Sequence, residues 1–326
     1  MTDQSARLPL AVLPTPLQEL ERLGEALGGP RLLVKRDDLT GLGMGGNKVR
    51  KLEYLVADAR RQGATTLITA GAPQSNHARQ TAAAAARCGL QCVLVLGPIA
   101  PPAINGNLLL DQLFGARIRW AGDRDRFAVM DEVAAEESAA GRTPYVIPYG
   151  GSNAIGAAGY LHAMGELARQ AEERRLTIDH IVFPSSSGGT QAGMVVGART
   201  YGISSHILGI SVDKDAPSLR RTVFDLALLT AAHHGVPFEL GMDDIEVNAD
   251  YTGAGYAIMG SPEREAIRLA AATEGLVLDP VYTGRAMAGL IDLIRRGTFA
   301  RDETVLFWHT GGAPALFAYA QEFVSP

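Results

Sequence analysis

The chain has 326 residues, 47% of them hydrophobic and 20% charged, which excludes a disordered chain and is typical of a globular protein of about two domains. Its net charge of −5 excludes the basic surface of a general nucleic-acid binder, and no apolar run approaches the ~20 residues that cross a membrane. We therefore expect neither nucleic acid nor a membrane as a partner. Because the first residues lack a signal-peptide pattern, we also expect a cytoplasmic location.

Short apolar runs alternate with helix-length segments along the chain. The runs that predict strands begin at Leu67, Cys92, Ala116, Tyr145, Ile178, His206, Ile245 and Val305. The predicted helices span about 76–88, 190–200, 218–234, 262–274 and 284–296. Strands that alternate with helices predict parallel sheets covered on both faces, so the fold class is α/β.

The first four predicted strands form one compact group, and no long polar linker separates them from the rest. We expect a small domain, residues 52–162, inserted into a large domain formed by 1–51 and 163–326. Cys88 and Cys92 are the two cysteines, so we expect neither a disulfide framework nor a cysteine-rich metal site.

The lysines are concentrated in one segment. Four of the 30 basic residues are lysines, and three of these are Lys35, Lys48 and Lys51. Two glycines and Asn47, a good N-cap, precede a predicted helix whose first turn holds Lys48, Arg50 and Lys51. Positive charge there opposes the helix dipole, which indicates either an anionic ligand or a solvated basic helix start. A lysine, unlike an arginine, can also lose its proton and form a Schiff base.

A polar segment, Gly71 to Gln80, follows the first predicted strand. Ser75 or Asn76 can cap the next helix, and ligands of α/β proteins bind at the carboxyl ends of parallel strands. The segment is either a site for a carboxylate group or a helix cap alone. His77 lacks the neighbours of a metal ligand, and we expect no metal.

A second loop of this kind, Pro184 to Gly193, is rich in serine and glycine. Its backbone N–H groups at a helix start suit a phosphate group. It matches neither a Walker loop nor G-x-G-x-x-G, although Asp213 after the next strand keeps a dinucleotide as the less favoured alternative. A reactive lysine, a carboxylate site and a phosphate site together favour pyridoxal 5'-phosphate as the cofactor.

Several longer motifs, in order along nearly the whole chain, resemble one known family. They are Lys35 to Asp38, Gly45 to Tyr54, Gln74 to Ala83, Gly150 to Asn153, Asp279 to Gly284 and His309 to Phe317. These motifs are similar to those of the aminocyclopropanecarboxylate deaminase/D-cysteine desulfhydrase family. The resemblance implies a tryptophan-synthase-β-like (fold type II) pyridoxal phosphate enzyme, a homodimer of chains with two parallel-sheet α/β domains and the cofactor in the cleft between them.

The resemblance also implies a set of site residues. Lys48 would form the Schiff base and carry protons, and Ser75 and Tyr282 would be the other catalytic residues. The cofactor would be bound by Lys48, Asn47, Lys51, Asn76, Thr310 and the loop residues Ser187, Gly188, Gly189 and Thr190. The substrate would be bound by Ser75, Asn76, His77, Tyr256, Tyr282 and Thr283.

Two threonines separate the branches of this family. The deaminase branch has an acid and a leucine where this chain has Thr283 and Thr310. A hydroxyl beside the pyridine nitrogen leaves that nitrogen largely neutral, which suffices for β-elimination. The resemblance therefore implies β-elimination of D-cysteine to pyruvate, hydrogen sulfide and ammonia. Arg285 stands where we expect a lysine in that branch.

Other functions remain open from the sequence. Within the family, the chain could be an L-cysteate sulfo-lyase or a 1-aminocyclopropane-1-carboxylate deaminase. From other classes, a non-catalytic ligand-binding relative or a nicotinamide oxidoreductase with a dinucleotide at residues 185–193 are the alternatives.

Overall fold

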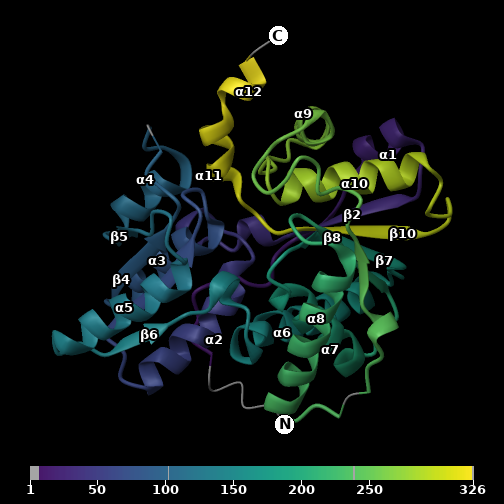
Figure 1. Ribbon diagram of the computed structural model, residues 1–326. Helices are drawn as coiled ribbons and strands as arrows, with labels where there is room; N and C mark the ends of the chain where they lie inside the picture. Colours follow the sequence, from purple (N-terminus) through teal and green to yellow (C-terminus); the bar gives the residue numbers. More distant parts are fainter. Residues whose placement is uncertain (1–6, 102, 238, 325–326) are drawn as a thin grey trace.

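The computed structural model describes residues 7–101, 103–237 and 239–324, which form two sheets with helices around them (Figure 1). The larger sheet has the strand order β1-β2-β10-β7-β8-β9, and all neighbours in it are parallel except β1 and β2. Its strands are β1 (Leu17–Glu19), β2 (Arg31–Arg36), β7 (His180–Ser185), β8 (His206–Ser211), β9 (Glu246–Asn248) and β10 (Thr304–His309).

The smaller sheet has the order β5-β4-β3-β6 and is parallel throughout. Its strands are β3 (Thr66–Gly71), β4 (Gln91–Leu96), β5 (Arg117–Trp120) and β6 (Pro144–Val146). These are the four strands that the first group of apolar runs predicts, so the predicted α/β class with two parallel sheets is confirmed.

The helices over 76–88, 190–200, 218–234, 262–274 and 284–296 are all present within one or two residues of the predicted bounds. They are α3 (Asn76–Cys88), α7 (Gly189–Tyr201), α8 (Ala216–His233), α9 (Ser261–Glu274) and α10 (Thr283–Arg295). The remaining helices are α1 (Glu21–Leu27), α2 (Lys48–Arg61), α4 (Gly106–Leu113), α5 (Arg126–Ala139), α6 (Ala154–Arg174), α11 (Ala313–Leu316) and α12 (Gln321–Val324). Over the described ranges, no helix is both long and apolar enough to span a membrane.

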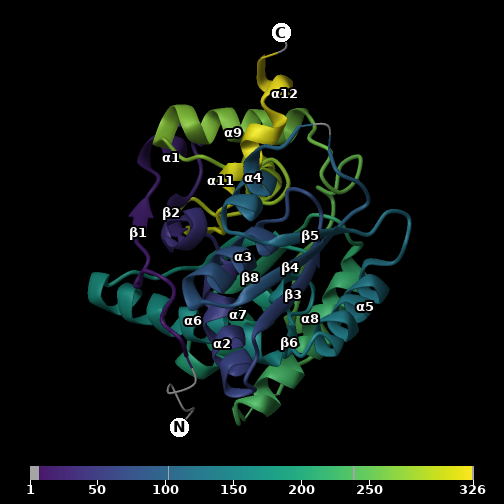
Figure 2. The same ribbon diagram turned by 90° about the vertical axis from the view of Figure 1, so that its left-hand side faces the viewer.

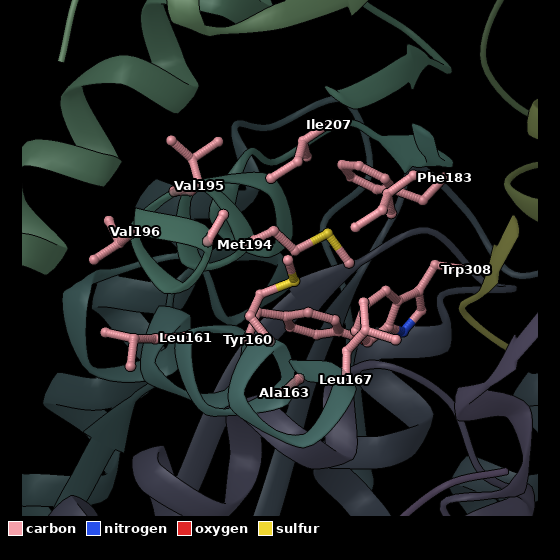
Figure 3. Packing of buried hydrophobic residues seen from close by; sticks show 14 of the residues in the cluster. Tyr160, Leu161, Ala163, Leu167, Phe183, Met194, Val195, Val196, Ile207 and Trp308 are labelled. Atoms are coloured by element: carbon pink, nitrogen blue, oxygen red, sulfur yellow. The ribbon is translucent and has the colours of Figure 1, made fainter. Parts of the chain in front are cut away.

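Side-chain alternation along the strands builds a hydrophobic layer on each face of both sheets. In the smaller sheet, Leu67 and Leu94 pack with α2 and α3, whereas Ile68 and Val93 pack with α5. In the larger sheet, one face packs with α6, α7 and α8, and the other with α1, α9 and α10. Figure 3 shows part of the first of these layers, where the rings of Tyr160 and Trp308 have centroids 5.7 Å apart.

Helices α2, α6 and α7 lie side by side and join the two sheets (Figures 1 and 2). Gly159 permits a close approach of α6 to α2, because a Cβ there would lie 2.4 Å from the carbonyl oxygen of Arg50. The predicted domain limits, after residues 51 and 162, fall inside α2 and α6, and they stay a prediction.

Candidate active site

A cavity opens where loops that follow strands of both sheets converge. Its wall comes from the segments after β3, β6, β7 and β10, together with the start of α2 and the residue before α10. The lining residues are Asn47, Lys48, Ser75, Asn76, His77, Tyr149, Gly150, Pro184, Ser185, Ser186, Ser187, Gly188, Thr190, Tyr282 and Thr310. The carboxyl ends of parallel strands are where α/β proteins bind ligands.

Lys48 is placed in this wall by the turn that begins α2. Gly46 adopts a φ of 128°, and a Cβ there would lie 2.4 Å from Gln80 Nε2, so only glycine fits this position. The next amide, that of Asn47, donates to the Thr310 carbonyl oxygen at 2.9 Å and ties the turn to the end of β10. Burial lowers the pKa of Lys48 to about 8, so near neutral pH a much larger fraction of this amine is unprotonated than of an ordinary lysine, although the protonated form still predominates.

Lys51 and Asn47 lie beside Lys48 but are bonded to the protein. The Lys51 amine donates to the Gly150 carbonyl oxygen at 3.1 Å and to Ser152 Oγ at 3.2 Å, behind the cavity wall. Asn47 makes no side-chain cap bond, because its backbone is already helical, and its amide donates instead to Thr190 Oγ1 at 3.2 Å. The prediction that Asn47 caps α2 with its side chain is therefore wrong.

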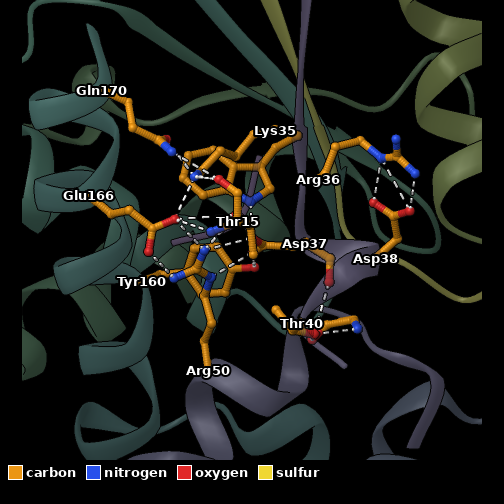
Figure 4. A network of polar contacts seen from close by, with 12 residues as sticks. Thr15, Lys35, Arg36, Asp37, Asp38, Thr40, Arg50, Tyr160, Glu166 and Gln170 are labelled. Atoms are coloured by element: carbon orange, nitrogen blue, oxygen red, sulfur yellow. Dashed lines mark hydrogen bonds and ion pairs between the residues drawn. The ribbon is translucent and has the colours of Figure 1, made fainter. Parts of the chain in front are cut away.

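Lys35 and Arg50 do not take part in the cavity. They belong to a buried ionic network with Asp37 and Glu166 (Figure 4). Arg50 binds both carboxylates, with Nη2 2.8 Å from Asp37 Oδ1 and 2.9 Å from Glu166 Oε1. The prediction that an anionic ligand explains the whole basic cluster is thus wrong for Arg50, whose anionic partners are carboxylates of the protein.

The segment after β3 begins a helix and also faces the cavity. Ser75 caps α3 through its Oγ, which accepts a hydrogen bond from the Ala78 amide at 3.1 Å. The Asn76 Oδ1 accepts a hydrogen bond from Asn107 Nδ2 at 2.8 Å, which leaves the amide N–H groups of Asn76 for the cavity side. Burial and the charge of Lys48 hold the pKa of His77 well below its ordinary value, so its imidazole is neutral.

The serine–glycine loop connects β7 to α7, as its sequence predicts. Gly188 has a φ of 83°, and a Cβ on Gly189 would lie 2.6 Å from Ser152 Oγ. Ser152 Oγ also lies 2.8 Å from Ser187 Oγ and accepts a hydrogen bond from the Gly189 amide at 3.2 Å. The loop thus presents hydroxyl groups and the amino end of a helix of 13 residues to the cavity, a geometry suited to phosphate.

Three tyrosines meet at one side of the cavity. Tyr282 and Tyr149 line it, and the Tyr256 hydroxyl lies 2.8 Å from the Tyr282 hydroxyl, outside the lining. Burial, together with the neighbouring Tyr256 and Tyr149, raises the pKa of Tyr282 well above its ordinary value. Tyr282 therefore keeps its proton at neutral pH.

The two threonines that separate the family branches have different positions. Thr310 lines the cavity. Thr283 is fully buried behind the wall, where its Oγ1 donates to Asp279 Oδ1 at 2.7 Å and accepts from the Asp279 amide at 2.8 Å. Its side chain therefore stabilises the turn that precedes α10, and the structure does not bring it to the cavity as a substrate contact.

Sequence reasoning missed several residues of the site. Tyr149, Gly150, Ser185 and Ser186 line the cavity, and Ser152 lies directly behind it. The motif Gly150 to Asn153 could have indicated the residues near 150, because it is among the motifs that resemble the family. The resemblance, however, assigns no role to it. Ser185 and Ser186 lie within the predicted loop Pro184 to Gly193, but the resemblance assigns a role only to Ser187, Gly188, Gly189 and Thr190.

The residues present fit pyridoxal 5'-phosphate. Gly188 has a φ of 83° and a Cβ on Gly189 would lie 2.6 Å from Ser152 Oγ, so the loop favours two residues without side chains, which allows the close backbone approach that a phosphate needs. The Lys48 amine, with its lowered pKa, supplies a group that can attack an aldehyde. Both features face the same cavity.

Comparisons with known proteins agree with this geometry. A family model described as "Pyridoxal-phosphate dependent enzyme" matches residues 8–311. The D-cysteine desulfhydrases of Salmonella newport (strain SL254) and Salmonella choleraesuis (strain SC-B67) are each 46% identical over 319 residues, which is 96% of this chain and 96% of theirs.

Solved structures give the same result. A structure described as an ACC deaminase homologue is 39% identical, with a TM-score of 0.90 over 98% of this chain and 95% of its own. The processed form of threonine deaminase isoform 2 from Solanum lycopersicum is 17% identical, with a TM-score of 0.68 over 96% of this chain and 83% of its own, and shows a likeness of fold alone.

Proposed function

The chain belongs to the family of pyridoxal-phosphate dependent enzymes, and on that premise we propose that it catalyses β-elimination from D-cysteine. The overall reaction consumes D-cysteine and water and gives pyruvate, hydrogen sulfide and ammonia. The observation that carries the proposal is the presence in one cavity of an amine of lowered pKa, a phosphate-type loop and the amino end of α3. The D-cysteine desulfhydrases that are 46% identical along almost the whole chain support the choice of substrate.

When bound, pyridoxal phosphate withdraws electrons from the α-carbon of an amino acid. Its phosphate would be held by Ser187 to Thr190 and Asn47, with Lys51 behind them, and its ring hydroxyl would lie beside Asn76. Lys48 would be the residue that holds the cofactor covalently, and its amine would also be the base that takes the α-proton. An amine whose pKa is about 8 suits that task, since it is neither fully protonated nor a weak base at neutral pH.

The start of α3 receives the substrate carboxylate in this proposal. Ser75, Asn76 and His77 lie at the amino end of a helix, where backbone N–H groups and the helix dipole favour an anion. The neutral imidazole of His77 adds no positive charge, so recognition of the carboxylate depends on hydrogen bonds. Tyr282 lines the same cavity and keeps its proton, so that it would orient the departing thiol or protonate it.

Thr310 supports elimination over ring opening. It is the lining residue that we assign to the cofactor's ring nitrogen, and its hydroxyl carries no charge. A thiol that leaves readily needs less electron withdrawal than a cyclopropane ring, so a neutral partner suffices. The second candidate is 1-aminocyclopropane-1-carboxylate deaminase activity, because a structure described as an ACC deaminase homologue is 39% identical to this chain.

We also propose that the enzyme is a cytoplasmic homodimer. Val12, Leu39 and Met44 are exposed apolar side chains, 67%, 45% and 55% accessible, and the Val12 amide bonds to the Thr40 carbonyl oxygen, so these segments adjoin. An adjoining set of exposed apolar side chains supports an interface between copies. Sedimentation equilibrium should give twice the 34.5 kDa mass of one chain, and a single-chain mass would contradict the dimer.

The function is tested with purified protein loaded with pyridoxal phosphate. D-Cysteine should yield pyruvate and sulfide in equal amounts, and L-cysteine, cysteate, β-chloroalanine and 1-aminocyclopropane-1-carboxylate are assayed beside it. 2-Oxobutanoate from the last compound, without sulfide from D-cysteine, would assign the deaminase activity instead. A yellow protein that turns over none of the five would contradict catalysis, and a colourless one that binds a nicotinamide would contradict the cofactor.

A further inference from the structure

We propose that Arg285 is a positioning residue that holds the loop of residues 251–258, and through it Tyr256, against Tyr282. Arg285 is 1% exposed and lies in the first turn of α10, three residues after Tyr282. This inference deepens the proposed function, because it names what sets the substrate side of the same cavity.

The guanidinium group of Arg285 connects three separate parts of the chain. Its Nη1 donates to the carbonyl oxygens of Val212 at 2.7 Å and Gly255 at 3.1 Å, and its Nη2 donates to that of Ile258 at 2.8 Å. Its Nε donates to Glu263 Oε1 at 2.8 Å. Arg285 is therefore hydrogen-bonded at once to the residue after β8, to the loop and to the start of α9.

The preferences of a helix N-terminus do not favour a buried arginine at position 285. A positive charge in the first turn of a helix opposes the helix dipole, and burial adds a desolvation cost. Glu263 offsets the charge, and its other oxygen accepts a hydrogen bond from the Gly260 amide at 3.0 Å. Three hydrogen bonds from Arg285 to backbone carbonyl oxygens further offset the desolvation cost. Two of these oxygens belong to the loop, which indicates that Arg285 fixes the position of the loop.

The loop needs such support. It contains no regular helix or strand, and Ala257 adopts a φ of 62°, a left-handed conformation that costs energy for any residue other than glycine. A second anchor also comes from α10, since the Tyr251 hydroxyl donates to Asp292 Oδ2 at 2.7 Å. Arg285 holds the middle of the loop, next to Tyr256.

The position of Tyr256 matters because of its contact with Tyr282. Their hydroxyl oxygens are 2.8 Å apart and their rings are nearly perpendicular, at 74°. Tyr282 lines the cavity, so a displaced Tyr256 would leave its hydroxyl without this partner. A lysine has one terminal nitrogen and no planar fork, so it cannot bind the Val212, Gly255 and Ile258 oxygens together in this geometry.

The test uses the holoenzyme and four variants: Arg285→Met, Arg285→Lys, Glu263→Gln and, as the matched control, Arg295→Met. Arg295 lies on the same helix but pairs with Glu265 at the surface, with a side chain 50% exposed. D-Alanine, which has no β leaving group, serves as the binding probe through the change in cofactor absorbance. Amide hydrogen exchange of residues 252–258 reports directly on the loop.

We expect Arg285→Met to raise the dissociation constant of D-alanine and the KM for D-cysteine by about tenfold. Exchange in residues 252–258 should accelerate, while exchange in β10 and the affinity for pyridoxal phosphate stay unchanged. Arg285→Lys and Glu263→Gln should give intermediate values, and Arg295→Met should match the wild type.

Wild-type values of D-alanine binding and loop exchange in Arg285→Lys and Arg285→Met would overturn the proposal, as would equal losses in Arg295→Met. If Arg285→Met does not fold, Arg285→Lys and Glu263→Gln decide by the same criteria. If the wild type neither binds D-alanine nor acts on D-cysteine, the proposed function fails, and loop exchange in Arg285→Lys still decides whether Arg285 holds the loop.

Discussion

The Lys51 side-chain nitrogen lies 3.1 Å from the carbonyl oxygen of Gly150, so this lysine is bonded to the segment that follows β6. Lys48, one turn earlier on α2, instead lines the cavity. Burial, and then the charge of Lys48, hold the pKa of Lys51 well below its ordinary value. The two lysines thus have similar surroundings but different partners, and only one of them faces the space where a ligand would lie.

Lys48 is therefore predicted to be the residue that carries the cofactor. After borohydride reduction and peptide mapping, the modification should be found on Lys48, and its discovery on Lys51 or Lys214 would contradict the assignment. Lys48→Ala should still bind pyridoxal phosphate through the loop at Ser187 to Thr190, but its rate of sulfide release should fall by about 10³-fold or more, because the base is lost. Lys214→Ala is the control and should keep full activity.

Attachment of the cofactor to the cofactor-free protein should depend on pH. The amine must be unprotonated to attack an aldehyde, and the pKa of Lys48 is lowered to about 8 by burial. The rate of attachment should therefore rise with pH, with a midpoint near 8, as followed by absorbance after mixing. Pyridoxine 5'-phosphate, which has no aldehyde, is the control, and its binding should show no such midpoint. A midpoint near 10.5, the ordinary value, would show that burial does not tune this amine.

Gly189→Asp should abolish tight cofactor binding while the fold survives. Its Cβ would meet Ser152 Oγ at 2.6 Å, and its carboxylate would repel the phosphate dianion. We expect the dissociation constant of pyridoxal phosphate to rise by about 100-fold or more in equilibrium titration. Gly189→Ala separates the steric effect from the charge, and Gly24→Asp, where a Cβ meets nothing within 4 Å, should bind the cofactor like the wild type. Unchanged affinity in Gly189→Asp would exclude this loop as the phosphate site.

The two threonines should have separable effects. The wild type should release sulfide from D-cysteine and fail to open 1-aminocyclopropane-1-carboxylate, and comparable rates on both would contradict the assignment of Thr310 to the ring nitrogen. Thr283→Glu should instead lower the free energy of unfolding by about 2–4 kcal/mol, because a second buried carboxylate would lie beside Asp279. Thr283→Val, which loses both hydrogen bonds between this hydroxyl and Asp279, should cost about 2 kcal/mol in the same urea titration. The double variant Thr283→Glu, Thr310→Leu is thus expected to gain ring opening only at a loss of stability.

The network around Arg50 should show the cost of an unpaired buried charge. Glu166→Gln should lower the free energy of unfolding by about 3–5 kcal/mol, whereas Glu132→Gln, from an exposed pair with Arg124, should change it by about 0–1 kcal/mol. Burial alone would raise the pKa of Glu166, but Arg50 and Lys35 lower it below the ordinary 4.5. The stabilisation that ionised Glu166 contributes is therefore present above pH 4.5 and lost as the pH falls below it. The urea midpoints of the wild type and of Glu166→Gln should therefore converge as the pH falls. A difference that does not depend on pH would contradict this ionisation.

Much of the fold and part of the site follow from local patterns in the sequence. The short apolar runs that contain Ile68 and Val93 predict buried strands, and the Ser75 cap and the loop at Gly188 depend on residues that are close together in the chain. Such features form between residues that are close in the chain, so they can be predicted from the sequence without knowledge of the tertiary contacts. The matching motifs likewise indicate the family without any knowledge of the structure.

Only the tertiary structure decided which charged residues serve the cavity. Lys35 and Arg50 bind Glu166, which is 131 and 116 residues away in sequence, whereas Lys48 has no carboxylate among the partners that shift its pKa. It also put Thr283 behind the wall and brought Tyr149 into the lining. These positions depend on the order β2-β10-β7 in the larger sheet and on the packing of α2 against α6. Because those contacts join strands and helices that are far apart in the chain, no local pattern specifies them.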